Sequence, residues 1–150
     1  MAAAIFDWLK RIVFGAPHTP PGVSPFAPDT GPAKLLVMRH AEKTGDRRDP
    51  HLSEAGFARA EKLVSYIPRQ FGKPDFLFAA TSSKRSSRPY ETLEPLAAAL
   101  GLKIDERFDD EDYDALVERL AKPTYASKFG VISWRHSDIP ALCAALGAPD

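Results

Sequence analysis

The sequence predicts an α/β domain in which helices cover both faces of a mainly parallel sheet. Short apolar runs alternate along the chain with longer stretches of helical periodicity, and this alternation is typical of βαβ units. A length of 150 residues favours one domain, and 44% hydrophobic with 27% charged residues is the composition of a globular protein. We therefore expect a three-layer α/β/α sandwich over residues 34–150.

Two segments of different composition precede this domain. Residues 1–14 place apolar side chains such as Ile5, Trp8 and Ile12 at helical spacing, with charged residues between them, and predict a short amphipathic helix. We expect this helix to pack on its own domain or on a second copy of the chain, which would form a homodimer, rather than on a membrane surface. Residues 15–33 hold six of the fourteen prolines and show no periodic pattern, so they predict an extended linker.

The sheet and its helices follow from the pattern after residue 34. Four short apolar runs predict buried strands, at residues 34–38, 75–80, 102–104 and 131–134. The first helix, residues 53–67, has Ser53 as its expected N-cap and puts Leu63, Val64 and Ile67 on one face. The same periodicity predicts three more helices, at residues 88–100, 112–120 and 139–146.

Charge and cysteine content exclude several classes of function. Twenty basic residues balance twenty acidic ones, so no domain-wide positive field is available to bind nucleic acid. Cys143 is the only cysteine, and in its Ala- and Leu-rich surroundings we expect a buried side chain rather than a nucleophile. A single thiol and a charge-interrupted N-terminus favour the cytoplasm. With neither a Cys and His cluster at metal-ligand spacing nor a Gly-rich phosphate loop, the sequence predicts no metal and no cofactor.

The residues that carry chemistry follow the predicted strands directly. Ligands of a parallel α/β sheet bind beyond the carboxyl ends of its strands, so these positions should meet at one edge of the sheet. Arg39 and His40 follow the first strand, and Arg135 and His136 follow the fourth. The segment after the second strand contains Arg88. The third strand leads into an acidic run, which consists of Glu106, Asp109, Asp110, Glu111 and Asp112.

Such a group of side chains favours a phosphate as its ligand. Arginine forks donate paired hydrogen bonds to phosphate oxygens and stay charged at physiological pH. A histidine beside those cations would be held neutral and nucleophilic, so that one of the two could attack phosphorus. The second histidine and the arginines would stabilise the charge on the equatorial oxygens, and a carboxylic acid could protonate the departing oxygen.

Three segments, LLVMRHAEK, SSRPYET and RHSDIP, resemble in their order and separation the histidine phosphatase superfamily, whose fold is phosphoglycerate mutase-like. The resemblance covers about residues 34–148. It implies that His40 is a nucleophile that forms a phosphohistidine and that Arg39 grips the phosphoryl group. Arg88 matches the arginine that the family carries after its second strand. His136 matches the histidine that closes the phosphate pocket, and Ser137, which follows it, would also bind the phosphate.

The resemblance also implies a general acid among residues 109–111. We favour Asp110, because Phe108 resembles the apolar residue that the family has two places earlier. Many relatives have a Glu in a Gly- and Trp-containing context at this position, which this chain lacks. Trp134 and Arg135 replace the small residues that are common before the second histidine, so we expect them to narrow the pocket or to add a phosphate contact.

Other residues near these motifs have simpler interpretations. Ala41 stands where the family usually has Gly, which is a mild departure. Lys84 and Arg85 are interpreted as part of a solvated loop. His18 and His51 are interpreted as surface residues without partners.

These observations predict a metal-independent phosphatase that hydrolyses a phosphomonoester or a phosphoramidate through a phosphohistidine on His40. Its partner would be a small phosphorylated substrate or a phosphoprotein. The alternative is a phosphate-binding or regulatory module of the same fold with weak or no catalysis, because the context of the acid is missing. A mutase is less favoured, since the domain has little room for the insertions that would hold a sugar acid through two transfers.

Overall fold

One five-stranded sheet forms the centre of the molecule. The structure is a computed structural model that describes residues 12–13, 25–27 and 29–148. The sheet order is β1-β2-β5-β3-β4. Four of the strands are parallel, and in this order β2, β5, β3 and β4 span Lys34–Arg39, Phe129–Trp134, Phe76–Ala79 and Ile104–Asp105. The strand β1, Ile12–Val13, pairs antiparallel with β2 at one edge, so the sheet is mainly parallel as predicted.

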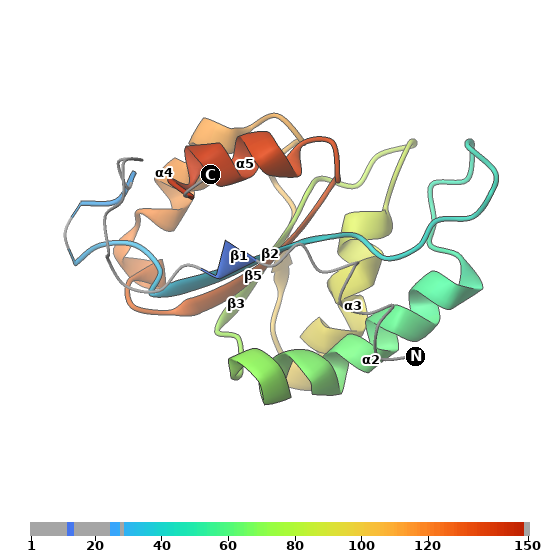
Figure 1. Cartoon of the computed structure of the whole chain (residues 1–150), viewed down its shortest axis with the longest axis horizontal. Coiled ribbons are helices and arrows are strands. Elements are labelled where there is room, and N and C mark those ends of the chain that lie inside the picture. The colour runs from blue at the N-terminus through green and yellow to red at the C-terminus, as the bar shows by residue number, and fades with distance from the viewer. Residues whose placement is uncertain (1–11, 14–24, 28, 149–150) are drawn as a thin grey trace.

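Helices lie on both faces of the sheet (Figure 1). On one face are α2, Glu54–Phe71, and α3, Arg88–Leu100. On the other face are α4, Tyr113–Leu120, and α5, Ile139–Ala145. A 3-10 helix, Pro123–Tyr125, precedes β5. The predicted three-layer α/β/α sandwich is confirmed.

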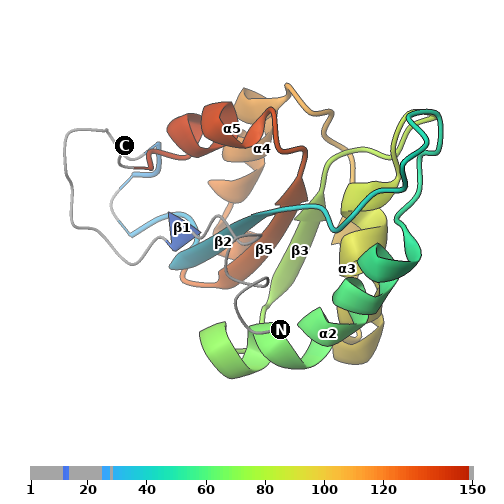
Figure 2. The same ribbon diagram turned by 45° about the vertical axis from the view of Figure 1, so that its right-hand side comes forward.

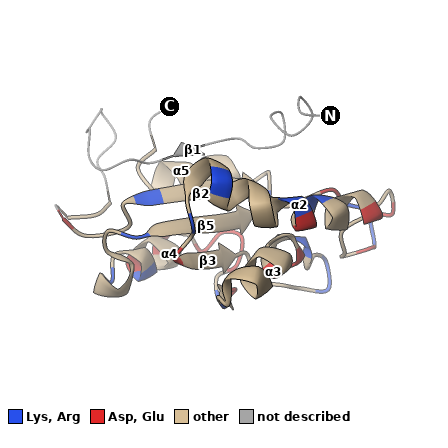
Figure 3. Ribbon diagram, turned by 90° about the horizontal axis from the view of Figure 1, so that it is seen from below, with Lys and Arg blue, Asp and Glu red and all other residues tan. Residues whose placement is uncertain are grey.

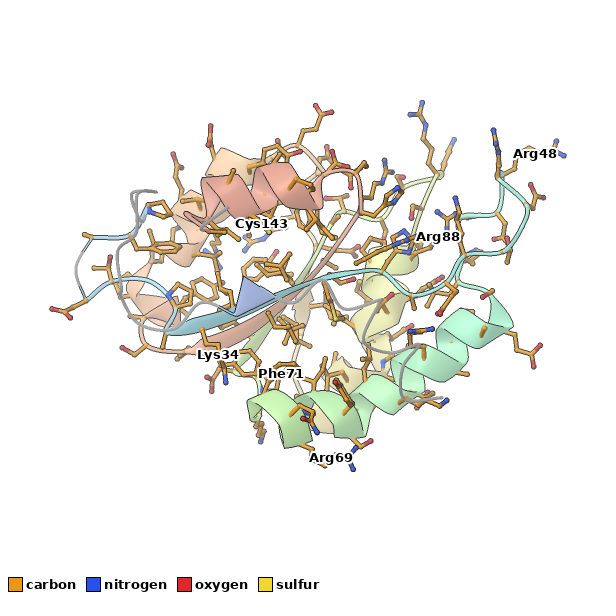
Figure 4. All side chains as sticks on the ribbon, viewed as in Figure 1. Lys34, Arg48, Arg69, Phe71, Arg88 and Cys143 are labelled. Atoms are coloured by element: carbon orange, nitrogen blue, oxygen red, sulfur yellow. The ribbon has the colours of Figure 1, made fainter. Side chains whose placement is uncertain are left out.

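The strands that lead to the site are buried on both faces. In β2, Leu35 and Val37 pack in the layer of α4 and α5, whereas Leu36 and Met38 pack in the layer of α2 and α3. Neither β3 nor β5 carries a charged position, which is typical of parallel strands covered on both faces (Figure 3). Cys143, labelled on α5 in Figure 4, is buried, and this burial raises the pKa of its thiol to about 11. The expectation of a buried Cys143 is confirmed.

The helices that flank the site begin where the sequence predicts. Ser53 caps α2 by accepting a hydrogen bond from the N–H of Gly56 at 3.1 Å. The helix α3 begins at Arg88 with a proline in its first turn, where the missing N–H costs no helical hydrogen bond. The helix α2 ends at Phe71 rather than at residue 67, because Pro68 in its last turn removes only one hydrogen bond before Gly72 ends the helix. The predicted ranges of α4 and α5 each differ from the structure by one residue at one end.

The structure differs from the sequence prediction at the N-terminal side of the domain. Ile12 and Val13, expected to end a helix, are extended and pair with β2; both are β-branched, and the edge of β2 satisfies their backbone groups. The rest of residues 1–14 lies outside the described residues. Within the predicted linker, Phe26 packs against the core and the carbonyl of Gly31 accepts a hydrogen bond from Ser127 at 3.0 Å. The described part of residues 25–33 therefore belongs to the domain.

Across the described ranges, no helix combines the length and the apolar character needed to cross a bilayer.

Candidate active site

Two histidines meet at the carboxyl ends of neighbouring strands. The strands β2 and β5 are adjacent and parallel, with Arg39 opposite Trp134 in the register. His40 therefore leaves β2 beside the segment that carries His136, and the His40 N–H donates to the Trp134 carbonyl at 3.1 Å. The structure thus brings the two Arg-His pairs to one edge of the sheet, as the order of the strands requires.

The His40 imidazole is buried and neutral. The residue is only 4% exposed, and its Nδ1 lies 2.7 Å from the Ala41 carbonyl oxygen. Because a carbonyl only accepts, Nδ1 carries the proton and Nε2 carries the lone pair. The pKa of His40 is lowered to about 4, mainly by burial and also by the charges of Arg39, Arg88 and His136, against the raising effect of the Ala41 hydrogen bond. At neutral pH the imidazole is therefore neutral, and Nε2 carries the lone pair that a base or a nucleophile requires.

The segment after β2 is fixed by the starts of two helices. The Ala41 N–H donates to the Thr92 hydroxyl at 2.9 Å, and that hydroxyl donates to the Arg88 carbonyl at 2.7 Å. On the other side, the Ser53 N–H donates to the Glu42 carbonyl at 2.8 Å. Gly56 lets α2 approach this closely, because a Cβ there would lie 2.3 Å from the same carbonyl oxygen. The Thr92 side chain of α3 and the Ser53 N–H at the cap of α2 therefore hold the segment that follows His40.

Two arginines bring positive charge to His40 from different elements. Arg39 ends β2, and its Nε is buried without a hydrogen-bond partner among the described residues. Arg88 begins α3 and is 9% exposed (Figure 4). Its Nε donates to the His51 carbonyl at 3.1 Å, and its Nη2 donates to the Asp49 carbonyl. Arg88 is therefore held in one orientation, while Arg39 keeps a buried donor that an anion could satisfy.

His136 is exposed at the carboxyl end of β5. Partial burial lowers the pKa of its imidazole, as do the charges of Arg39 and Lys43, and Asp138 acts in the opposite direction. Arg39 and Lys43 are therefore near enough to His136 for their charges to act on its imidazole. The hydroxyl of Ser137, expected to bind phosphate, donates instead to the Asp138 carboxylate at 2.6 Å.

Asp110 is tied to the segment after β5. Its carboxylate pairs with the Arg135 guanidinium at 2.8 Å, and its carbonyl accepts a hydrogen bond from the Trp134 indole at 2.9 Å. Burial raises the pKa of Asp110, although Arg135 lowers it. Trp134 is fully buried in the core, so it does not narrow the pocket, and Arg135 binds Asp110. The geometry favours these contacts over the expected phosphate contact.

Two loops stand beside the site. Residues 42–52 and residues 81–87 are joined where the Ser87 N–H donates to the Pro50 carbonyl at 2.9 Å, and they project from the same side of the sheet (Figure 2). Arg48 lies at the tip of the first loop (Figure 4). Lys84 and Arg85 are exposed in the second loop, as expected for a solvated segment. The first loop carries charges of both signs (Figure 3).

The prediction that His51 has no partner is wrong. Its Nδ1 donates to the Glu91 carboxylate at 2.5 Å, and its carbonyl accepts from Arg88. Sequence reasoning missed this pair because the two residues are 40 positions apart. Glu91 lies three residues after Arg88 on a predicted helix, which is the only signal that could have drawn attention to it. His18 lies outside the described residues.

The assembled side chains suit the transfer of a phosphoryl group. They comprise a buried neutral imidazole, two arginines whose charges act on it, and a second histidine that is exposed. Within the described part of the chain, no three His, Cys, Asp or Glu side chains gather closely enough to hold a metal ion.

Comparison with known proteins finds similarity in structure. Neither family models nor curated protein sequences match the chain. A crystal structure from Agrobacterium tumefaciens, assigned as the phosphohistidine phosphatase SixA, superimposes with a TM-score of 0.54 and 21% identity, over 79% of this chain and 77% of that one.

Two further solved structures give lower scores. A structure from Nakamurella multipartitia, also assigned as SixA, has a TM-score of 0.49 and 23% identity, over 72% of this chain and 62% of that one. A mycobacterial glucosyl-3-phosphoglycerate phosphatase in complex with inorganic phosphate has a TM-score of 0.47 and 17% identity, over 73% and 76% of the two chains. The first of the three likenesses confirms the predicted fold class.

Proposed function

Starting from the phosphoglycerate mutase-like fold of the histidine phosphatase superfamily, which this chain has, we propose that the protein is a metal-independent phosphatase. The observation that carries the proposal is the buried His40, whose Nε2 bears a lone pair while the charges of Arg39 and Arg88 act on the ring. An imidazole held neutral next to two guanidinium groups is suited to attack a dianion that those groups bind.

The reaction would proceed in two steps. In the first, Nε2 of His40 attacks phosphorus in line, the bond from phosphorus to the leaving oxygen or nitrogen breaks, and the leaving group departs with the electron pair and gains a proton. In the second, water attacks the phosphohistidine and gives a proton to the carboxylate that protonated the leaving group, the bond from phosphorus to Nε2 breaks, inorganic phosphate leaves, and Nε2 regains its lone pair. Arg39, Arg88 and His136 would hold the equatorial oxygens in both steps.

Asp110 is the proposed proton donor. Because its pKa is raised, Asp110 is protonated more often than an exposed carboxyl group would be, as a general acid requires. Arg135 connects it to the segment of His136. When the substrate is a phosphoramidate, the leaving nitrogen is more basic than an alcohol oxygen, so the demand on this acid is smaller.

The substrate class is a phosphomonoester or a phosphoramidate, on a small molecule or on a protein. The name of the structure from Agrobacterium tumefaciens, a phosphohistidine phosphatase, supports the phosphoramidate within the limits of a likeness in fold. A phosphoprotein would present such a group to the exposed His136.

The second candidate function is a phosphate-binding module with weak or no catalysis. The ion pair between Asp110 and Arg135 favours it, because a guanidinium stabilises the ionised form of the carboxyl group, which has no proton to donate to a leaving group.

Hydrolysis of an aryl phosphate in the presence of a chelator separates the two functions. The phosphatase should turn over with the chelator present and be inhibited by vanadate, whereas the His40→Ala variant should lose at least about a thousandfold in kcat/KM. Vanadate binding by a wild-type protein that hydrolyses neither aryl phosphate nor phosphoramidate would favour the binding module.

A further inference from the structure

The orientation of Arg88 depends on a loop. Its guanidinium is nearly buried, and the two contacts that orient it are hydrogen bonds to the carbonyls of His51 and Asp49. These carbonyls belong to residues 49–52, at the end of the loop between β2 and α2. A shift of this short segment would therefore turn or displace Arg88.

Glu91 fixes that segment from α3. Its carboxylate is only 12% exposed and accepts two hydrogen bonds, one from the Leu52 N–H at 2.8 Å and one from Nδ1 of His51 at 2.5 Å. The His51 N–H donates to the Asp49 carboxylate at 2.9 Å, which sets the turn of the same segment. Each end of residues 51–52 is thus tied to a carboxylate.

Together these contacts form a closed ring. Arg88 donates to the segment, the segment donates to Glu91, and Glu91 stands three residues after Arg88 on the same helical face. A ring that begins and ends on one rigid helix fixes the geometry of the groups it contains. The helix α3 therefore positions its own Arg88 through the segment of residues 49–52.

We propose that Glu91, together with His51, is a positioning residue for Arg88, and that the carboxylate acts on phosphate binding only through the guanidinium. The inference rests on the proposed function, because it takes Arg88 as a phosphate ligand. Glu91 touches neither the phosphate nor His40 in this role. It holds the two carbonyls that aim Arg88.

The charge of His51 strengthens the ring. The hydrogen bond and the charge of Glu91 raise the pKa of the His51 imidazole, with Asp49 acting in the same direction and Arg88 against it. These three are the charged groups that face His51 from α3 and from its own loop. The protonated form is favoured below the raised pKa and is lost as the pH rises through it, so the hold on Arg88 should weaken on the alkaline side.

A double-mutant cycle on kcat/KM tests whether Glu91 acts through Arg88. Glu91→Ala should lose about tenfold, and Glu91→Gln, which keeps an oxygen for Leu52, should lose less. Adding Glu91→Ala to Arg88→Ala should cause no further loss, since the group that Glu91 positions is already absent. Glu94→Ala, which removes an exposed carboxylate one turn along α3, is the matched control and should match wild type.

The dependence of kcat/KM on pH separates a positioning role of Glu91 from a contribution to stability alone. The alkaline decline in kcat/KM that belongs to His51 should disappear in His51→Ala and in Glu91→Gln. Losses that add in the double variant, or a Glu91→Ala variant as active as Glu94→Ala, would overturn the proposal.

A measurement without substrate keeps the inference distinct from the proposed function. The Nε–H signal of Arg88 in nitrogen-15 NMR should exchange slowly with water in the wild type, and it should approach the rate of exposed Arg48 in Glu91→Ala. An Arg88 signal that exchanges equally slowly in both proteins would overturn the positioning role. If the wild type hydrolyses no phosphate compound while the Arg88 signal responds as expected, the proposed function is wrong, but Glu91 still positions Arg88.

Discussion

The two halves of the candidate site are held by different kinds of contact. In the nucleophile half, residues 39–42, backbone groups donate to and accept from Thr92 and Ser53 at the starts of two helices. In the acid half, residues 106–112 with residues 135–138, the Asp110 carboxylate pairs with the half-buried Arg135 guanidinium, while the Asp110 carbonyl accepts a hydrogen bond from the Trp134 indole. The comparison teaches that hydrogen bonds of the main chain position the segment of His40, whereas an ion pair between two side chains positions the carboxylate of Asp110.

Protonation of His40, in the nucleophile half, should give the largest effect. Burial lowers the pKa of the imidazole from 6.5 to about 4, so the unfolded chain takes up this proton at a higher pH than the folded chain. Stability should therefore fall as the pH decreases from 6.5 to about 4, by roughly 3 kcal/mol from this group. Urea unfolding of wild type and of His40→Asn across this range measures the difference. Equal pH slopes for the two proteins would contradict a buried neutral His40.

Removal of the acid should depend on the leaving group. Asp110→Asn should lower kcat about a hundredfold for an alkyl phosphate, whose alkoxide needs a proton, and by less than about threefold for nitrophenyl phosphate. Rates with both substrates measure the effect, with Asp109→Asn as the control for a neighbouring exposed carboxylate. If both substrates lose activity equally, Asp110 does not act as the general acid.

Loss of the Thr92 hydroxyl should damage the nucleophile half. Thr92→Val keeps the shape of a fully buried side chain but leaves the buried Ala41 N–H without its partner. We expect a loss of about 2 kcal/mol in the free energy of unfolding and a lower kcat/KM. Urea unfolding measures the first, and Thr44→Val, at an exposed hydroxyl, provides the comparison. Comparable stabilities of the two variants would show that the hydroxyl bridge contributes little.

A smaller effect is expected where α2 approaches the loop. A Cβ at Gly56 would meet the Glu42 carbonyl at 2.3 Å, while a Cβ at Gly45 would meet nothing within 4 Å. The clash should outweigh the helix-forming advantage of alanine, so Gly56→Ala should lose about 1 kcal/mol in stability. Thermal unfolding of both alanine variants measures it. A Gly56→Ala protein as stable as Gly45→Ala would show that the loop can give way at no cost.

The meeting of the arginine and histidine side chains at one edge of the sheet could be predicted from the sequence because its rule is local. Each of Arg39, His40 and His136 directly follows an apolar run, and parallel strands carry such residues to one edge. Arg88 follows from the same rule, since it begins the helix after β3.

The remaining contacts could not be predicted because they join distant residues. The pairing of Ile12 and Val13 with β2 and that of His51 with Glu91 depend on which surfaces meet after folding. The face of the sheet on which Trp134 lies could not be predicted either. Every position of β5 is buried, so the strand lacks the alternation of apolar and polar residues that distinguishes the two faces.

Isolation of the phosphorylated protein tests the central claim most directly. The wild type is mixed for milliseconds with a phosphorus-32-labelled aryl phosphate or phosphoramidate and denatured in alkali, in which phosphohistidine is stable. The proposed function predicts label on His40 that is lost in acid, and no label in His40→Ala. Label on another residue, or undiminished turnover by His40→Ala, would contradict it.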